Sequence, residues 1–426
     1  MRLHSLIWLA AFSISAHAIT LEELFTSLKS SPAITQDRLS VEESKKVTEV
    51  LHGSLYPKVY GFASIEHYSN PTNLRPLLPT ESAALMSQNG TLPFSRNIGK
   101  VGLKGSIPLY NGSLYALIDE LKMTHKSLQS QKHLDMLSKE AELVDSDAAL
   151  IYFERFTNAL NSQNTSIQKT KERIDVGVKN GRYAQAESLK LQNALSSLRI
   201  SIEDTTAKRV AYAQQIRALT NLEITQSIPM NLKGAITTSS EDVAFLEPFK
   251  QKVEAKNYAS KAAERSLLPV VTADATLFRG WGEAYNNGDQ FHQDYGTVGI
   301  YVNLPLFDAS SYKSIEKTHL AALQAQSALE QKRIELSAKI KTLHSDENSL
   351  INSLSSAKMR VASSEELLAI GKLAVQNGRL SIEEYLRYED ALLDAKATQA
   401  AIEWKLWRTR SAIAIIYGID LADIME

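Results

Sequence analysis

The chain has 426 residues and no cysteine, and its 47 basic and 48 acidic residues leave a formal net charge of −1. The absence of cysteine excludes disulfides and thiolate metal sites. The near-neutral charge balance argues against a nucleic acid as a partner.

The first 18 residues have the pattern of a secretory signal peptide. A basic start at Arg2 precedes a largely apolar stretch over residues 6–14, and Ala16-His17-Ala18 fits a small-x-small cleavage site. The apolar stretch is too short to span a membrane, and no later stretch approaches the roughly 20 continuous apolar residues of a membrane helix. We expect the mature chain to begin near Ile19, and any part of it that enters a membrane to do so as strands.

After this segment the sequence contains an internal repeat. VGLKGSIPLYNG at residues 101–112 returns as VGIYVNLPLFDA at 298–309, and VKNGRYAQAESLKLQNAL at 178–195 returns as VQNGRLSIEEYLRYEDAL at 375–392. The same 197 residues separate both pairs, so everything between the two motifs is matched in length. The pattern predicts two copies of one large unit. The expected domains are a signal peptide at 1–18, a first repeat at 19–225, a linker at 226–242 and a second repeat at 243–426.

Each repeat is expected to open with a shorter helix, about 21–51 and 243–266, followed by two strands. Apolar and polar side chains alternate strictly near 59–65 and 101–107 in the first copy, and near 271–277 and 297–304 in the second. Aromatic residues crowd the strand ends, which resembles the interfacial girdles of outer-membrane barrels. A soluble antiparallel sheet packed on a helix is the alternative. The segments 68–96 and 278–294 are interpreted as exposed loops.

The longest predicted elements are helices over 111–178 and 309–375, where proline is absent and apolar residues recur at helical spacing. At 1.5 Å per residue each would reach roughly 100 Å, longer than an ordinary globular domain needs. An Asn-Gly pair at 180–181 and another at 377–378 interrupt the pattern, and a second helical pattern follows each pair. Each copy is therefore expected to form an αα-hairpin that turns at Asn-Gly.

A repeated corner, Pro-Leu-aromatic-Asn/Asp, joins strand to long helix in both copies. Pro108 and Pro305 lack an N–H group, so strand pairing is predicted to end at each of them. Asn111 and Asp308 are good N-caps for the helices that follow. We assign these four residues an architectural role, the conversion of a strand into a helix without a long loop.

Four strands cannot close a barrel, and lipid does not tolerate open strand edges, so a membrane role requires subunits to pool their strands. The duplicated corner, combined with a tip glycine followed by an acid and leucines, resembles the TolC family of outer-membrane efflux channels over essentially the whole mature chain. The resemblance implies a mainly α fold with a small β part in a homotrimer. Long helical hairpins would form an α-barrel across the periplasm, and four β-strands per chain would contribute to a 12-stranded outer-membrane β-barrel.

The resemblance also suggests where the pore narrows. In the family, acids of the second copy project inward at the periplasmic end and constrict the channel. By that match Glu384 is the candidate gate acid, Glu187 is its first-copy counterpart, and Arg387 stands where many relatives have a second acid. Three Glu384 carboxylates in a trimer would repel one another and attract cations. Arg387 could instead form acid–base pairs between subunits, and a solvated pair on a helix surface is the alternative.

Further implied partners are a periplasmic adaptor (membrane fusion) protein, an inner-membrane transporter of the RND, ABC or MFS type, and outer-membrane lipid. The exposed hairpin tips are the expected docking sites for hairpins of the adaptor. The docking candidates are the turn residues Asn180, Gly181 and Arg182 and their counterparts Asn377, Gly378 and Arg379.

The sequence contains no metal-ligand spacing, nucleophile elbow, phosphate loop or pair of catalytic carboxylates. We therefore expect no enzyme activity, no cofactor and no metal. The expected function is a trimeric exit duct in the outer membrane of a Gram-negative bacterium, with a large periplasmic part, serving a tripartite efflux or type I secretion system. A periplasmic coiled-coil adaptor or scaffold protein is the alternative, because these proteins share long helices.

Overall fold

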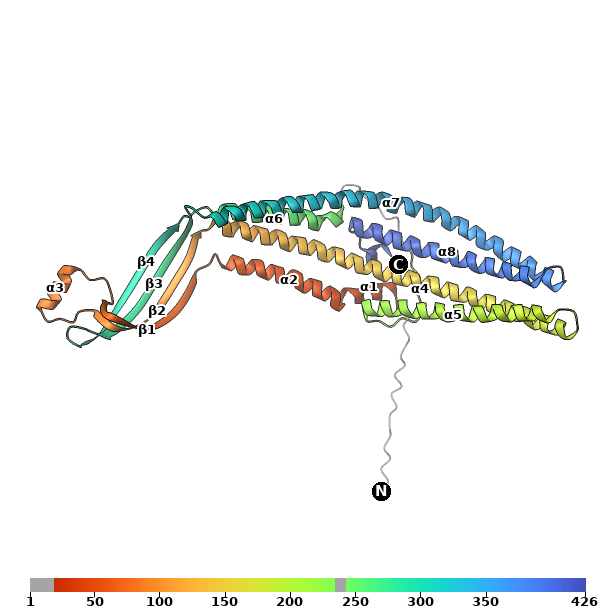
Figure 1. The fold of residues 1–426 in the computed structure, drawn as a ribbon, viewed down its shortest axis with the longest axis horizontal. Helices are drawn as coiled ribbons and strands as arrows, with labels where there is room; N and C mark the ends of the chain where they lie inside the picture. Colours follow the sequence, from red (N-terminus) through yellow and green to blue (C-terminus); the bar gives the residue numbers. More distant parts are fainter. Residues whose placement is uncertain (1–18, 234–242) are drawn as a thin grey trace, which may run out of the picture. The chain divides into compact units, whose positions relative to one another are not determined.

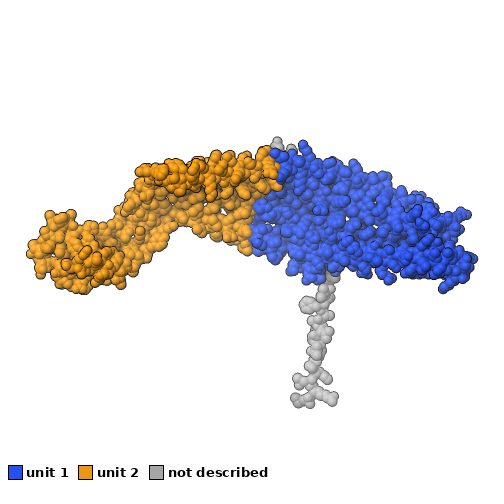
Figure 2. Space-filling model, viewed as in Figure 1, with its two compact units in different colours: residues 1–38, 131–245, 333–426 blue, residues 39–130, 246–332 orange. Residues whose placement is uncertain are grey.

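The structure is a computed structural model, and it describes residues 19–233 and 243–426. The predicted signal peptide and most of the predicted linker lie outside the described residues. The chain forms two compact units, and each takes residues from both sequence repeats (Figure 2). Unit 1 comprises residues 1–38, 131–245 and 333–426, and unit 2 comprises residues 39–130 and 246–332.

The described elements follow the predicted order, and the two copies match in helix length (Figure 1). Helices α4 and α7 both have 68 residues, and the return helices α5 and α8 both have 36. None of the described helices is long and apolar enough to cross a membrane. The elements are α1 (Leu21–Lys29), α2 (Pro32–Gly53), β1 (Lys58–Asn73), α3 (Pro79–Ser87), β2 (Phe94–Tyr110), α4 (Gly112–Lys179), α5 (Gln185–Thr220), η1 (Ala244–Leu246), α6 (Glu247–Arg265), β3 (Val270–Glu283), β4 (Gln290–Asn303), α7 (Ala309–Gln376), α8 (Ile382–Tyr417) and α9 (Leu421–Ile424).

The strands form one antiparallel sheet in unit 2, in the order β1-β2-β3-β4. The prediction of two strands ahead of each long helix is confirmed. The copies meet where β2 pairs with β3, and Gly102 lies opposite Phe278 there. A Cβ atom at Gly102 would lie 2.2 Å from the carbonyl oxygen of Leu277, so only glycine fits this close approach of two backbones.

The two predicted loops are shorter than expected. Strand β1 continues to Asn73 through Pro71, and helix α3 occupies part of the first loop. Proline is tolerated here because β1 is an edge strand and its register shifts between His67 and Thr72. The second loop is reduced to residues 284–289, because Gly280 and Gly282 lie inside β3, where a Cβ atom would clash with Leu74 and with Asn97 and Ser95, respectively.

The first predicted helix is also divided. It forms α1 and α2, which are separated by Ser30 and Ser31 ahead of Pro32. Proline suits the first position of a helix but breaks a helix interior, because it lacks an N–H group and its ring clashes with the preceding turn. The helix predicted over 243–266 is present as η1 and α6.

Three of the four corner predictions are confirmed. The side-chain oxygen of Asn111 accepts a hydrogen bond from the Leu114 N–H at 3.1 Å, and Asp308 caps α7 in the same way. Hydrogen bonds from Ser311 and Ser310 lower the pKa of Asp308 to about 2. Strand β4 ends at Asn303, just ahead of Pro305.

The prediction for Pro108 is wrong. Pro108 pairs with Thr272, and β2 continues to Tyr110, which pairs with Val271. Leu109 is therefore the extra residue of a bulge. A bulge shifts the pairing register, so the strand can pass a residue that has no N–H to donate.

Within unit 1, α4 carries three acids spaced seven residues apart, Glu140, Asp147 and Glu154. Each accepts a hydrogen bond from a backbone N–H of a non-α4 segment: Glu140 from Leu421 at 2.9 Å, Asp147 from Ile228 at 3.0 Å, and Glu154 from Ser227 at 2.8 Å. Seven residues are nearly two helical turns, so the three carboxylates share one face. They attach the start of the predicted linker and the C-terminal helix to α4.

Two of these acids are fully buried, and each has one carboxylate oxygen without a hydrogen-bond partner among the described residues. Burial raises the pKa of Asp147 to about 7, and the nearby charge of Glu154 adds to the rise, while the bond from Ile228 opposes it. Burial and the adjacent Asp420 raise the pKa of Glu140 well above its ordinary value, although Lys29 partly offsets this. Both acids therefore retain a proton at a pH where an exposed acid has lost it.

We expect unit 1 to lose stability as the pH rises from about 4 to 8. In that window the folded state binds more protons than the unfolded state, so the free energy of unfolding falls by about 1.4 kcal/mol per pH unit for each such carboxyl. Asp147→Asn retains an oxygen for the Ile228 N–H but has no proton to lose. The fall of its free energy of unfolding with pH should therefore be shallower by about 1.4 kcal/mol per pH unit, the contribution of one carboxyl. Thermal unfolding followed by circular dichroism across this pH range measures the slope.

The control for this experiment is Asp204→Asn, which changes an exposed acid on α5. Its slope should equal that of the unmodified protein. An unchanged slope in Asp147→Asn would contradict the assignment of a retained proton to this residue.

Candidate functional site

The two hairpin tips have the same backbone geometry, and both lie in unit 1. Gly181 has φ 71° and Gly378 has φ 66°, the left-handed conformation that glycine adopts most easily. The N–H of Arg182 donates to the carbonyl of Gly177 at 2.7 Å, and the N–H of Arg379 donates to that of Ala374 at 2.9 Å. The predicted turns at Asn-Gly are therefore present.

All six predicted docking residues are exposed at these tips. They are Asn180, Gly181, Arg182, Asn377, Gly378 and Arg379. Exposure leaves them accessible to another chain, and their role in docking stays a prediction.

Glu187 and Glu384 lie on the first turns of α5 and α8, and Arg387 lies on the second turn of α8. Glu384 is exposed, and its N–H donates to the N-cap hydroxyl of Ser381 at 3.2 Å. Within the chain, Arg387 pairs with Glu383 at 3.3 Å rather than with Glu384. Glu187 pairs with Lys190 at 3.2 Å. The gate role of Glu384, Arg387 and Glu187 stays a prediction.

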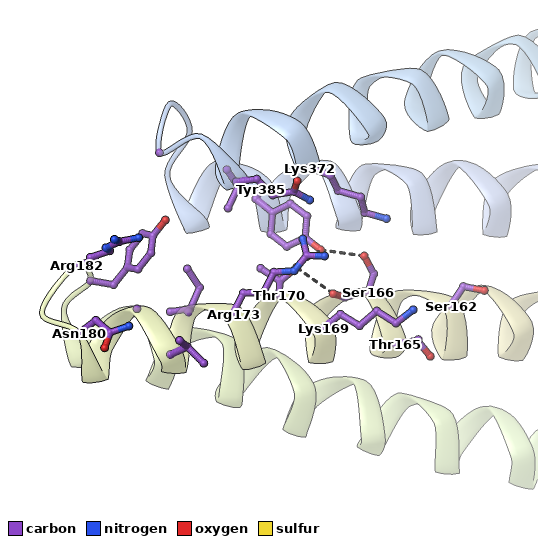
Figure 3. A pocket seen from close by; sticks show the side chains of 17 residues that line it. Ser162, Thr165, Ser166, Lys169, Thr170, Arg173, Asn180, Arg182, Lys372 and Tyr385 are labelled. Atoms are coloured by element: carbon purple, nitrogen blue, oxygen red, sulfur yellow. Dashed lines mark hydrogen bonds between the residues drawn. The ribbon is translucent and has the colours of Figure 1, made fainter.

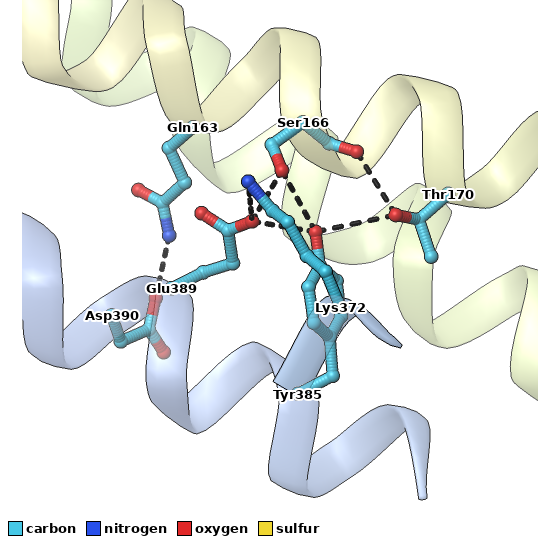
Figure 4. Close-up of polar contacts among 7 residues, drawn as sticks. All are labelled: Gln163, Ser166, Thr170, Lys372, Tyr385, Glu389 and Asp390. Carbon is cyan, nitrogen blue, oxygen red and sulfur yellow. Dashed lines mark hydrogen bonds and ion pairs between the residues drawn. The ribbon is translucent and has the colours of Figure 1, made fainter. Parts of the chain in front are cut away.

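A buried polar network that the sequence analysis missed lies one residue away from Glu384. Tyr385 and Glu389 of α8 are 1% and 3% exposed, and they face α4 (Figure 4). The Tyr385 hydroxyl donates to Glu389 at 2.5 Å and lies 3.0 Å from the Ser166 hydroxyl of α4. Ser166 also donates to Glu389, and Thr170 donates to the Tyr385 oxygen at 3.2 Å.

Two further contacts extend this network. Lys372 of α7 lies 3.7 Å from a Glu389 oxygen, and the Gln163 amide of α4 donates to Asp390 of α8 at 2.9 Å. Burial and the hydrogen bond to Glu389 raise the pKa of Tyr385, so its hydroxyl keeps its proton. We call Ser166, Thr170, Lys372, Tyr385 and Glu389 the latch network, because it ties the α4–α5 hairpin to the α7–α8 hairpin near their tips.

The sequence holds a signal for this network. Ile382, Tyr385 and Glu389 follow helical spacing, so they share the buried face of α8. An acid on an otherwise apolar face requires partners. The first-copy counterparts of Tyr385 and Glu389 are Ser188 and Gln192, so the first copy has no equivalent of these two members of the network.

The fold is similar to those of solved outer-membrane channels. The Campylobacter jejuni CmeC outer membrane channel is 18% identical, with a TM-score of 0.78 over 93% of this chain and 85% of that one. The Vibrio cholerae outer membrane protein VceC is 13% identical, with a TM-score of 0.76 over 93% and 95%. The Neisseria gonorrhoeae MtrE channel, in an open state, is 14% identical, with a TM-score of 0.74 over 93% and 88%. At these identities the likeness establishes the fold.

The sequence comparison covers part of the chain. Residues 246–418 match the outer membrane efflux protein family, whereas no curated protein matches the chain. The match covers most of the second sequence repeat, from the end of η1 to the end of α8. The second repeat is thus similar to outer membrane efflux proteins, and the fold is that of outer-membrane channels. The match favours the channel over the adaptor or scaffold that the helices alone left open.

The latch network should hold the two hairpins together near their tips. Tyr385→Phe removes a hydroxyl and leaves Glu389 short of one donor, which costs about 1–3 kcal/mol for a buried group. We expect faster backbone hydrogen exchange near residues 162–182 and 372–390, measured by mass spectrometry. Tyr388→Phe is the control, because the Tyr388 hydroxyl makes no hydrogen bond to another described residue and its ring packs against Gly371 and the neighbouring apolar cluster. Equal exchange in the two variants would show that the network does not fasten the tips.

Proposed function

We propose that three copies of this chain assemble into an exit duct, in line with the trimeric channels of the family. The observation that carries the proposal is the division of the sheet into an apolar and a polar face. Pairing aligns Val59, Leu103, Leu277 and Val298 on one face, and all four side chains are exposed. The other face carries polar side chains such as Lys104, Asp274 and Thr297.

An exposed apolar face on a sheet is stable when lipid covers it. Ile65 and Val298 are 88% and 83% exposed, which leaves most of each side chain without an apolar neighbour in the single chain. Strands β1 and β4 each have one unpaired edge in the described sheet. Three sheets joined at these edges would pool 12 strands, above the minimum of about 8 for an outer-membrane barrel. Lipid would then cover the apolar face, and the polar face would line the lumen.

The remaining partners follow from the hairpin tips. We propose that the exposed turn residues, including Arg182 and Arg379, contact a periplasmic adaptor protein, and that an inner-membrane transporter of the RND, ABC or MFS type supplies the energy. The chain would then complete a tripartite efflux or type I secretion system. The exposure of all six turn residues and the equal lengths of the two hairpins support docking at both tips.

A charge introduced on one face of β4 or on the other distinguishes a membrane sheet from a soluble one. Val298→Arg places a charge on the apolar face, where lipid would make it cost about 2–4 kcal/mol. Thr297→Arg places the same charge on the neighbouring polar face. We expect Val298→Arg to reduce the amount of detergent-extracted trimer in the outer-membrane fraction, and Thr297→Arg to leave it nearly unchanged. Because both residues are exposed in the single chain, equal yields of the two variants would contradict a lipid-facing sheet.

The gate proposal has a separate test in planar lipid bilayers. Three Glu384 carboxylates around one pore should attract cations, so Glu384→Ala is expected to lower cation selectivity and change the single-channel conductance. Glu187→Ala, the first-copy counterpart, should have the smaller effect. If Glu384→Ala changes neither quantity, this residue does not form the constriction.

A further inference from the structure

A cavity of about 910 Å³ lies in unit 1 between the tips of the α4–α5 and α7–α8 hairpins (Figure 3). Its lining includes four basic side chains, Lys169, Arg173, Arg182 and Lys372, and none of its lining residues is acidic. Hydroxyl groups complete the polar lining, among them those of Thr165, Ser166 and Tyr385. Every charged group that lines this cavity is therefore positive, and the hydroxyl protons are donated to groups of the chain itself.

The charge in this cavity is poorly compensated. In the described part of the chain, Lys169, Arg173 and Arg182 lie within ion-pair distance of no acid, whereas the neighbouring Lys171 pairs with Asp175 at 2.7 Å. Lys372 has only the 3.7 Å contact with Glu389. Like charges gathered without counterions repel one another, so an anion bound among them would lower the free energy of the folded chain.

The cluster is not a by-product of the duplication. At the second-copy positions that correspond to Lys169 and Arg173 the chain has Glu366 and Ile370. The cluster therefore arises only where α4 of the first copy faces α7 of the second.

We propose that this cavity binds a multivalent oxyanion, a small ligand with several carboxylate or phosphate groups. The volume lies in the range of about 300–1,000 Å³ that is typical of small-molecule sites. Arginine donates two parallel hydrogen bonds to a carboxylate or phosphate. The side-chain amides of Asn180 and Gln376, which also line the cavity, can donate to the same anion. The site uses residues of one chain only, so anion binding does not depend on the proposed trimeric duct.

The site shares one residue with the latch network. Lys372 lines the cavity and contacts Glu389, so a bound oxyanion and Glu389 compete for its ammonium group. Removal of the Glu389 charge should therefore strengthen anion binding. If the positive charge of the tips attracted anions without a defined site, the binding affinity would not depend on the Glu389 carboxylate.

Isothermal titration calorimetry tests the site on the full mature protein in detergent at low ionic strength, with citrate and inorganic pyrophosphate as probes. The tighter probe identifies carboxylate or phosphate chemistry. We expect Arg173→Gln and Arg182→Gln each to weaken binding by about tenfold or more, since each removes a charge-assisted contact. Glu389→Gln should tighten binding. The control is Arg379→Gln, the second-copy counterpart of Arg182, which does not line the cavity and should change the affinity by less than about twofold.

Three results would overturn the proposal. The first is that neither citrate nor pyrophosphate binds with a Kd below about 10 mM. Another is equal weakening by Arg379→Gln and Arg173→Gln, which would indicate diffuse surface charge. The third is binding of an acidic peptide together with failure of both small probes, which would assign the cavity to a protein partner. All three arginines are exposed, so the variants are expected to fold, and a negative titration would leave the trimer and bilayer results unaffected.

Discussion

The structure depends on the equal length of its two hairpins. Each residue of an α-helix adds 1.5 Å of length and 100° of rotation. One residue inserted into α4 alone would turn Ser166 and Thr170 away from Tyr385 and shift them along the helix, and the latch network would be lost. With 68 residues in both long helices, the two tips of unit 1 end together. The latch network and the basic cavity exist only because this match is kept.

Duplication gives the tips a common geometry, and divergence gives them their chemistry. Both turns use a glycine with positive φ, and both close with the same backbone hydrogen bond. The side chains that meet between the tips are different: the first copy supplies Lys169 and Arg173, and the second supplies Tyr385 and Glu389. With first-copy residues in both copies, serine and glutamine would replace Tyr385 and Glu389 opposite Ser166. The polar contacts between the hairpins therefore require that the two copies differ.

The sequence predicted features that depend on neighbouring residues. Alternating side chains identified the strands, Asn111 and Asp308 identified the helix starts, and Asn-Gly identified the turns, because each signal is a local backbone preference. The wrong prediction for Pro108 has a different origin, since the bulge that accommodates it forms only when β3 lies alongside. Glu389 was missed for the same reason. Its partners Ser166 and Lys372 are 223 and 17 residues away in the sequence, and only the tertiary fold brings them together.

Unit 1 stabilises its buried carboxylates in two ways, by hydrogen bonds from side chains or by a retained proton. The two ways make the carboxylates sensitive to different changes in solution. Glu389 receives hydrogen bonds from Ser166 and Tyr385 and lies near the Lys372 ammonium, so anything that competes for those donors acts on it. Asp147 has one backbone donor and one oxygen without a partner among the described residues, and burial holds its pKa near 7. A proton is the natural partner of such an oxygen. Anions should therefore act on the tips, whereas pH should act on the attachment of the segments that follow α5 and α8. These two inputs act on different stretches of α4, around residue 147 and over residues 166–173, so the chain can respond to each without the other.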